Sequence, residues 1–311
     1  MPGVTHHRTG LGWLVLAGVT WGTSGTLGVL LRGESGLSLL PAGGYRILVG
    51  GLLILAFVLL TRRLRMPRTT SAWRRVAGLG LASGLYQITF FSSIGYIGIA
   101  VTALVTIGST PIMVLAIETL TGRVKLTGRL ALALAAALVG LVLLAGSPPA
   151  GLPVRDALIG ATLSLVAGAS FAAISLLGAN PDPDFDDATG TGLAFVGGGI
   201  VVLAVAALFG PIGFTVTPLA ILWVVLLGLV PSAVAYLSYL RGLRTQSGTI
   251  GSLVALLEPV TATTLAALVF AEWLTPLAAL GAALLLAAVV LTTLGSGTSV
   301  PRDTMEPELH P

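Results

Sequence analysis

The stretch 255–264, ALLEPVTATT, lies inside a long apolar run and places Glu258 directly before Pro259. A charged side chain in the middle of a membrane costs at least ~2.5–3.5 kcal/mol and almost never faces lipid. Proline removes one backbone hydrogen bond from a helix and tends to kink it. The stretch therefore predicts an interrupted helix, and the rest of the chain shows whether such a helix crosses a membrane.

The chain as a whole has the composition of a polytopic membrane protein. Of its 311 residues, 55% are hydrophobic and only 9% are charged, whereas a soluble domain carries about 25% charged residues. Cysteine is absent, which excludes disulfides, thiolate metal sites and cysteine nucleophiles. The three histidines lie in the polar termini, and the sequence contains no phosphate-binding P-loop, no HExxH and no GxSxG motif. We therefore expect no metal, no cofactor and no enzymatic activity.

Ten apolar segments have the roughly 20 residues that a membrane-spanning helix needs. They are predicted at 11–31, 41–61, 76–96, 99–119, 128–146, 157–178, 190–209, 218–240, 249–271 and 274–295. The predicted organisation is an N-terminal tail 1–10, a first five-helix repeat 11–148, a second five-helix repeat 157–295 and a C-terminal tail 296–311.

Lysine and arginine residues are distributed unevenly between the predicted loops. If the N-terminus is cytoplasmic, the inner segments hold all but three of the 16 basic residues. Of those three, Arg32 and Arg155 fall outside and Arg46 falls within a span. Because basic loops stay on the cytoplasmic side, we expect a protein of the inner or plasma membrane with both tails in the cytoplasm. Topology thus explains the net charge of +4 without nucleic-acid binding.

The two halves of the chain align with each other at one offset. Pro111 pairs with Pro259, 148 positions later, and the same offset joins three further pairs: 50–51 with 198–199, 55–56 with 203–204, and 126–127 with 274–275. Because each unit has five spans, an odd number, the second unit enters the membrane from the opposite side. Inverted repeats place substrate sites near the midplane, close to interrupted helices. We predict an all-α fold of ten transmembrane helices, arranged as two inverted repeats around a central cavity.

Several motifs resemble those of the EamA family of the drug/metabolite transporter superfamily. They are TWG in the first span, YRILVGG in the second and LLEPVTATTLAALVFAEWLT in the ninth, and the resemblance covers nearly the whole chain. The resemblance implies a ten-helix basket around a central cavity, and secondary transport or export of amino acids and other small metabolites. One departure is Val124, which stands where the second half has Glu272, so that the loop glutamate often seen in both copies occurs once.

Glu258 and Arg46 each allow a structural and a functional interpretation. Glu258 lies roughly 13 Å from the cytoplasmic end of its span, near mid-membrane. It either joins two helices by a hydrogen bond or lines the cavity, where it senses substrate or protons. Arg46 lies roughly 7–8 Å below the outer membrane surface, and it either snorkels to the headgroups or meets Glu258 or a substrate carboxylate. Pro111, preceded by Thr110, is expected to kink its helix as Pro259 does, for packing or for gating.

Two other glutamates lie near span ends. Glu118 is expected at the cytoplasmic gate, in a snorkelling ion pair with a basic residue from the set Arg123, Lys125 and the arginines of 62–75, rather than as a buried coupling site. Glu272 is expected to be a structural cap or a surface charge on the outer side.

Aromatic residues make up only 6% of the chain, so their positions are informative. Trp13, Trp73, Trp223 and Trp273 lie near span ends, as in an interfacial belt, whereas Trp21 lies mid-span among small residues. A mid-span tryptophan among small residues suits helix packing or a cavity wall. The residues predicted to line the cavity are Trp21, Ser24, Tyr86, Gln87, Phe90, Tyr236, Tyr239 and Glu258. Those predicted to gate or couple transport are Arg46, Pro111, Glu118, Glu258 and Pro259.

A secondary transporter that exports small polar metabolites by alternating access is the function favoured, with amino acids as the first substrate class and protons as a candidate coupling ion. Drugs, amines or sugars are alternative substrates. An intramembrane enzyme and a passive channel or scaffold are alternative functions, although the spans contain neither His nor Cys. The expected partners are the small-molecule substrate and the lipid bilayer, with the chain as a monomer or a homodimer.

The charge distribution predicts that the N-terminal tail, the 62–75 loop and the C-terminal tail share the cytoplasmic face. A Thr69→Cys variant introduces the only thiol, because the chain has no cysteine. An impermeant thiol reagent should not label this variant in intact cells and should label it after permeabilisation. Labelling from outside intact cells would contradict the topology.

Overall fold

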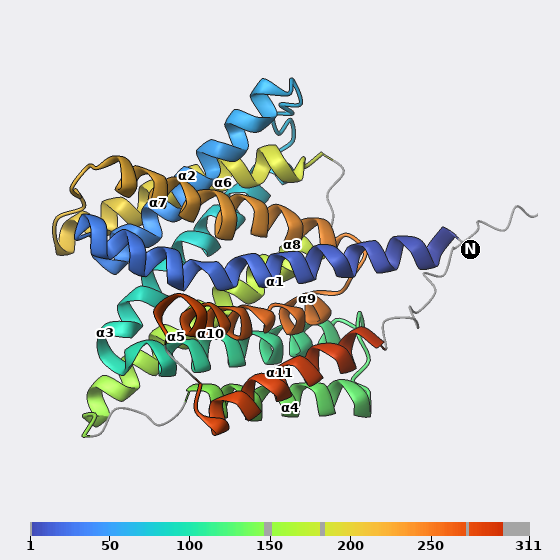
Figure 1. Ribbon diagram of the computed structural model, residues 1–311. Coiled ribbons are helices and arrows are strands. Elements are labelled where there is room, and N and C mark those ends of the chain that lie inside the picture. Colours follow the sequence, from blue (N-terminus) through green and yellow to red (C-terminus); the bar gives the residue numbers. More distant parts are fainter. Residues whose placement is uncertain (1, 146–150, 181–183, 272–273, 295–311) are drawn as a thin grey trace, which may run out of the picture.

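The computed structural model describes residues 2–145, 151–180, 184–271 and 274–294. Within these ranges all regular structure is helical, as predicted, and no β-strand occurs. In chain order (Figure 1) the elements are α1 (Pro2–Ser35), α2 (Leu39–Leu60), α3 (Thr70–Leu120), α4 (Gly128–Ala145), α5 (Val154–Gly178), α6 (Asp187–Phe209), α7 (Pro218–Gly228), the π-helical η1 (Leu229–Val234), α8 (Ala235–Leu243), α9 (Gly248–Val254), α10 (Leu257–Phe270) and α11 (Pro276–Leu294).

Helix α3 crosses the membrane twice. In the described part of the chain nine helical segments are long and apolar enough to span a bilayer, and α3 is the longest, with 51 residues. Gly98 within it has φ 75° and ψ 165°, a conformation that other residues rarely adopt. The hydroxyls of Ser93 and Thr102 lie 3.0 Å apart, although nine residues of straight helix would separate them by ~13.5 Å. The chain therefore reverses at Gly98, which reconciles these nine segments with the ten predicted spans.

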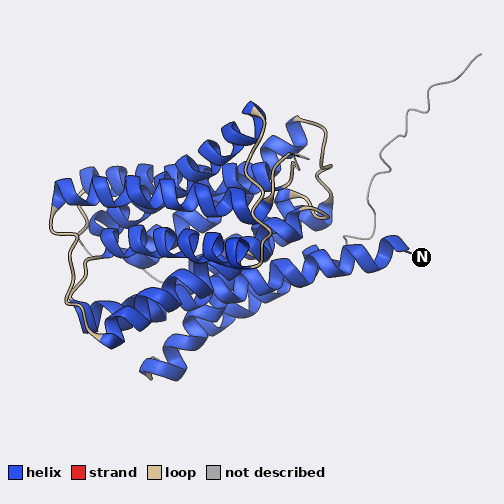
Figure 2. Cartoon of the chain, turned by 90° about the horizontal axis from the view of Figure 1, so that it is seen from above, coloured by secondary structure: helices blue, strands red, loops and turns tan. Residues whose placement is uncertain are grey.

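The other boundaries agree with the predicted spans to within a few residues, with three differences. Helix α1 begins at Pro2, so the predicted tail 1–10 is largely helical, and Figure 2 shows the start of α1 extending beyond the bundle. The eighth span consists of α7, η1 and α8, because a π-helical turn surrounds Pro231. The ninth span is divided into α9 and α10, as the Glu258-Pro259 pair predicted.

Helix packing follows the inverted repeat. α1, the first helix of the first repeat, packs against α8 and α10, and its equivalent α5 packs against both halves of α3. The equivalent helices α2 and α6 pack together, as do α4 and α11, which lie side by side in Figure 1. Glycines allow this last approach, because a Cβ atom at Gly140 would lie 2.8 Å from the carbonyl oxygen of Gly281.

Six helix starts are closed by the side chain of the residue that precedes them. The side chain accepts a hydrogen bond from the backbone amide three residues later, which satisfies a donor that the helix leaves free; the residues are Thr69, Thr127, Asp186, Thr217, Ser247 and Thr275. The local sequence therefore sets where α3, α4, α6, α7, α9 and α11 begin. Ser247 matters most for the site described below, because α9 reaches the centre of the bundle.

The α4–α11 contact predicts that Gly140→Ala is destabilising. The added methyl group would enter a space too small for it, and overpacking of this kind costs about 1–3 kcal/mol. Thermal unfolding in detergent should show a lower Tm than that of the wild type. Gly197→Ala is the matched control, because a Cβ atom there would meet no atom within 4 Å. Equal stability of the two variants would contradict the close packing of α4 on α11.

Candidate functional site

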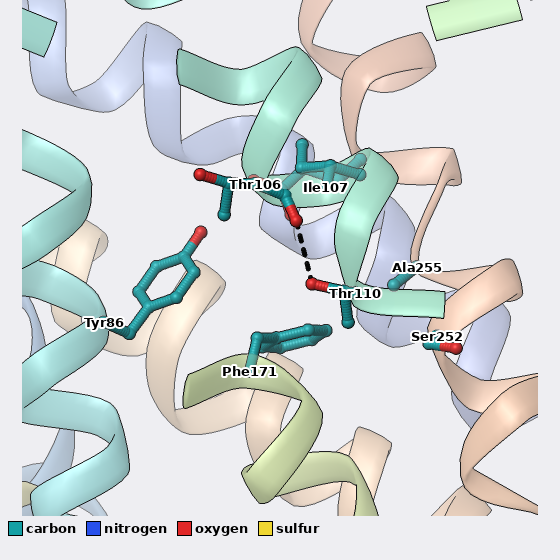
Figure 3. Close-up of a pocket in the computed structure, with 8 residues that line it drawn as sticks. Tyr86, Thr106, Ile107, Thr110, Phe171, Ser252 and Ala255 are labelled. Atoms are coloured by element: carbon teal, nitrogen blue, oxygen red, sulfur yellow. Dashed lines mark hydrogen bonds between the residues drawn. The ribbon is translucent and has the colours of Figure 1, made fainter. Parts of the chain in front are cut away.

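A small cavity lies where α3, α5, α9 and α10 meet, between the two repeats. Its volume is about 20 Å³, which is room for about one water molecule and too little for an amino acid. The residues that line the cavity (Figure 3) are Tyr86, Thr106, Ile107, Thr110, Phe171, Ser252, Ala255 and Glu258.

Four of these residues are related by the internal repeat. Ile107 and Ala255 are 148 positions apart, as are Thr110 and Glu258. A proline follows Thr110 and another follows Glu258, and each deprives the carbonyl four residues earlier of its usual helical donor. Those two carbonyls belong to Ile107 and Ala255. Both repeats thus bring a weakened helical turn to the same cavity, where such irregularity is tolerated in a membrane protein.

In the second repeat the proline interrupts the helix. The chain turns between α9 and α10, and the backbone amide of Glu258 donates to the carbonyl of Ala255 over 2.9 Å. This bond replaces the one that Pro259 cannot supply. The interruption places Glu258 in the first turn of α10, where the free amides of a helix start favour negative charge.

In the first repeat the helix continues through its proline. Gly98 is the non-helical residue of α3, and Pro111 lies within the helix beyond it. Thr110 holds this turn, because its hydroxyl donates to the carbonyls of Thr106 over 2.9 Å and of Gly168 in α5 over 3.2 Å; the bond to Thr106 is dashed in Figure 3. The two prolines therefore differ in effect: only Pro259 interrupts its helix.

The Glu258 side chain faces the cavity and forms no ion pair with any described residue. Its carboxyl group has no hydrogen-bond partner among the described residues, so the alternative of a structural hydrogen bond between helices is not supported. Arg46 interacts with it electrostatically, but the two form no ion pair within 4.0 Å. The cavity thus contains an acidic group that no described residue binds and that can bind a ligand from outside the protein.

Arg46 points into the bundle and does not snorkel to the headgroups. The residue is 9% exposed, and its guanidinium donates to the Pro231 carbonyl from Nη2 over 3.2 Å and to the Ser232 hydroxyl from Nε over 3.3 Å. The Ser232 hydroxyl in turn donates to the Leu227 carbonyl over 3.3 Å, which lacks the amide that Pro231 would otherwise provide. Arg46 therefore supports the π-helical turn η1 and does not contact Glu258 directly.

An aromatic cluster lies beside the cavity. The ring of Trp21 lies 4.9–5.3 Å from the rings of Tyr239, Tyr236 and Phe171, and Phe171 also contacts Tyr86 with ring centroids 6.0 Å apart. The Tyr239 hydroxyl bonds to Ser175 over 2.7 Å and so joins α8 to α5. Of the predicted cavity residues, Tyr86 and Glu258 line the cavity itself. Trp21 and Tyr239 pack against Phe171, and Tyr236 packs against Trp21.

The remaining predicted cavity residues point in different directions. Phe90 stacks on Tyr86 with ring centroids 5.5 Å apart. Gln87 is buried and approaches Gly43 of α2. It points away from its neighbour Tyr86, because consecutive residues on a helix point about 100° apart. Its amide, the indole Nε1 of Trp21 and the hydroxyl of Ser24 are buried without hydrogen-bond partners in the described structure. The prediction that Gln87 lines the cavity together with Tyr86 is therefore wrong.

Glu118 corrects a second expectation. It is buried, and it accepts hydrogen bonds from the amide of Gly248 over 2.8 Å and from the amide and hydroxyl of Thr249 over 2.9 and 2.6 Å. The predicted ion pair with Arg123, Lys125 or the arginines of 62–75 does not form. The reason is geometric: the start of α9, which is far away in the sequence, packs beside the end of α3 and offers three donors.

Phe171, Thr106 and Ser252 line the cavity but were not among the predicted site residues. The repeat holds a signal for Phe171, because its counterpart is Thr23, the residue that follows the TWG motif of the first span. Thr106 and Ser252 carry no such signal and are defined by packing alone. Glu272 and Trp273, predicted as an outer cap and an interfacial residue, lie outside the described residues.

Comparison with known proteins agrees with this architecture. A relative from Bacillus subtilis (strain 168), named uncharacterized transporter YwfM, is 28% identical over 274 residues, which cover 88% of this chain and 90% of that protein. A protein of known crystal structure shares the fold with a TM-score of 0.74 at 18% identity, covering 93% of this chain and 98% of that one. The EamA-like transporter family matches residues 8–146 and 158–294. This membrane protein therefore belongs to the EamA-like transporter family.

Proposed function

We propose that this transporter exports small polar metabolites, amino acids first among them, by alternating access at the central cavity. The proposal rests on Glu258, a mid-membrane carboxyl group that faces a cavity between the two repeats. No described residue donates a hydrogen bond to this carboxyl group. A buried charge without a partner is costly, so the site favours a cation that can reach it. We assign this role to a coupling proton.

The size of the cavity supports alternating access over a passive channel. A space of about 20 Å³ cannot hold a metabolite while the helices stay as they are, so passage requires movement of one repeat against the other. The interrupted turn between α9 and α10 suits such movement, because a helix without its full set of hydrogen bonds bends at that turn. The inverted repeat provides two related arrangements, one open to each side.

A counterflow screen in proteoliposomes tests the function. Purified protein is loaded with one unlabelled compound, and uptake of the labelled compound is followed for amino acids, sugars, amines and drugs. We expect saturable counterflow with at least one amino acid and less with the other classes. A flux that rises linearly with concentration would indicate a channel, and counterflow with amines or sugars alone would exclude amino acids as the substrate class.

Glu258→Gln should abolish proton-driven uphill export and leave counterflow largely intact. Glutamine keeps the shape of the side chain but cannot carry the proton, and exchange needs no net proton movement. Gradient-driven transport and counterflow are measured side by side in the same proteoliposomes. Glu34→Gln is the control. Glu34 lies at the C-terminal end of α1, away from the cavity, where it accepts a hydrogen bond from the Thr217 hydroxyl. Loss of both activities in Glu258→Gln would instead mean direct substrate binding, and loss of neither would mean packing only.

Pro259→Ala should slow every mode of transport with little loss of folded protein. Alanine restores the amide that can bond to the Ala255 carbonyl, so α9 and α10 would join into one stiffer helix. Pro111→Ala is the matched comparison and should have the smaller effect, because α3 is already continuous at that position. Initial counterflow rates and the yield of monodisperse protein provide the two measurements. Equal effects of the two variants would contradict a role for the interruption.

A further inference from the structure

The two ends of α3 hold the second repeat at one end of the bundle. The chain reverses at Gly98, so Arg75 near the start of α3 and Glu118 near its end lie at the same face. Glu118 binds the start of α9 through the three hydrogen bonds described above. A carboxylate that accepts from three donors makes a strong contact, because each bond is charge-assisted.

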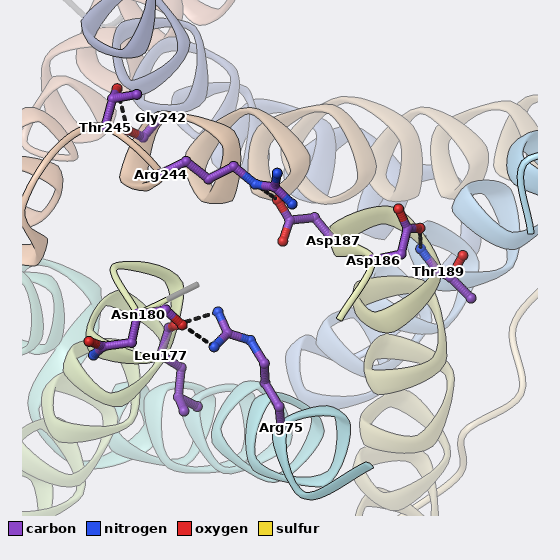
Figure 4. A network of polar contacts seen from close by, with 9 residues as sticks. All are labelled: Arg75, Leu177, Asn180, Asp186, Asp187, Thr189, Gly242, Arg244 and Thr245. Atoms are coloured by element: carbon purple, nitrogen blue, oxygen red, sulfur yellow. Dashed lines mark hydrogen bonds and ion pairs between the residues drawn. The ribbon is translucent and has the colours of Figure 1, made fainter. Parts of the chain in front are cut away.

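Arg75 makes the second contact. Its guanidinium donates to the carbonyls of Leu177, in the last turn of α5, and of Asn180, just beyond that helix (Figure 4). It also lies 4.8 Å from the centre of the Phe185 ring. The last carbonyls of a helix lack partners within the helix, and a cation is favourable there. Both α3 ends therefore contact helices of the second repeat.

The space around the start of α9 is shaped for the carboxylate. A Cβ atom at Gly248 would lie 3.1 Å from Oε1 of Glu118 and 3.0 Å from the Val114 side chain, so glycine lets the two segments approach. Thr249 and Glu118 are 1% and 2% exposed, so water does not compete for these bonds in the closed arrangement.

This contact is connected to the cavity through a single short helix. α9 carries Thr249 at its start, and Ser252 and Ala255, one and two turns later, form part of the cavity wall. Release of Thr249 from Glu118 frees the segment whose other end borders the cavity. The Glu118–Thr249 contact therefore fixes one end of a helix whose other end borders the cavity.

The internal repeat has no equivalent contact at the opposite face. The positions related to Glu118, Gly248 and Thr249 by the offset of 148 are Ala266, Ala100 and Val101. These apolar side chains can neither donate nor accept hydrogen bonds. The polar contact belongs to one face, so the two faces differ in how firmly they close.

We propose that Glu118 and Arg75 form a clamp that closes the predicted cytoplasmic face, and that release of Glu118 from α9 opens the cavity toward that face. Glu118 is then a positioning residue, which acts through α9 on the cavity wall. The clamp rests on the proposed transport function. It adds to that function the contact that must break before the cavity opens toward the predicted cytoplasmic face.

The test measures access to the cavity without any substrate. Ser252→Cys provides a single reporter thiol in a chain that has no cysteine, and an impermeant maleimide is applied to vesicles of either orientation. In the Glu118→Gln background the labelling rate from the cytoplasmic face should rise roughly tenfold, the population change expected when one charge-assisted hydrogen bond is lost. Labelling from the other face should not rise.

A milder variant and a double variant keep the test independent of folding defects. Thr249→Val removes the hydroxyl donor but keeps the backbone, so its effect should be smaller and in the same direction. Combined with Glu118→Gln its effect should be less than additive, because both variants weaken one shared hydrogen-bond network. Where Glu118→Gln does not yield folded protein, Thr249→Val carries the test.

Two controls separate gate opening from general loosening. Asp187→Asn removes another carboxylate from the same face, but its 2.6 Å ion pair with Arg244 lies within the second repeat (Figure 4), so labelling of Ser252→Cys should not change. Ala137→Cys, buried in α4, should stay unlabelled in every background.

Three results would overturn the clamp: unchanged labelling of Ser252→Cys in the folded Glu118 and Thr249 variants, an equal rise from both faces, or a parallel rise at Ala137→Cys. These results are distinguishable from failure of the proposed function. A protein with a cytoplasmic rise in labelling but no counterflow would contradict transport while supporting the clamp, and the reverse pattern would contradict the clamp alone.

Discussion

The requirement that every backbone polar group find a partner inside a membrane governs this structure. Three prolines remove helical donors near the centre of the bundle, and the helix responds differently at each. At Pro259 the helix breaks, and the next available amide takes over the free carbonyl. At Pro231 a π-helical turn forms, with Ser232 and Arg46 as donors. At Pro111 the helix persists, with the Thr110 hydroxyl bonded to two neighbouring carbonyls. Two of these three positions border the cavity, so the backbone is weakened at the place where the proposed mechanism requires movement.

The repeat supplies a symmetric scaffold, and a few substitutions make the two halves chemically different. Thr110 and Glu258 occupy equivalent positions on the cavity wall, yet the hydroxyl is satisfied by carbonyls and the carboxyl group is not. The two faces of the bundle also differ. At one face Glu118 binds the start of α9, whereas its counterpart in the second repeat is Ala266, which cannot form such bonds. Two chemically identical halves would favour neither side of the membrane. Charged groups present in only one half can bias the equilibrium between the two arrangements, because they stabilise one of them more than the other.

Part of the cavity lining was predictable from sequence, at positions where a residue's chemistry is unusual for its surroundings. Glu258, Tyr86 and Trp21 stood out as polar or aromatic groups at mid-span, and all three lie at or beside the cavity. Gln87 stood out for the same reason and was misplaced, since the face of a helix that meets a given neighbour depends on how that helix is rotated. Phe171 and Ser252 are ordinary residues in a membrane helix, and nothing local distinguishes a cavity wall from a packed interface.

The sequence by itself determined that the chain crosses a membrane, that its two halves are inverted copies, and that the ninth helix breaks before Pro259. These properties follow from hydrophobicity, an odd number of spans and the missing amide of proline, all of which act locally or additively along the chain. The tertiary structure decided the partners of the charged residues. Arg46 bonds to Ser232, 186 positions away, and Glu118 bonds to Thr249, 131 positions away. Such contacts depend on which helix ends come together and on how each helix is rotated, and these are consequences of packing the whole bundle.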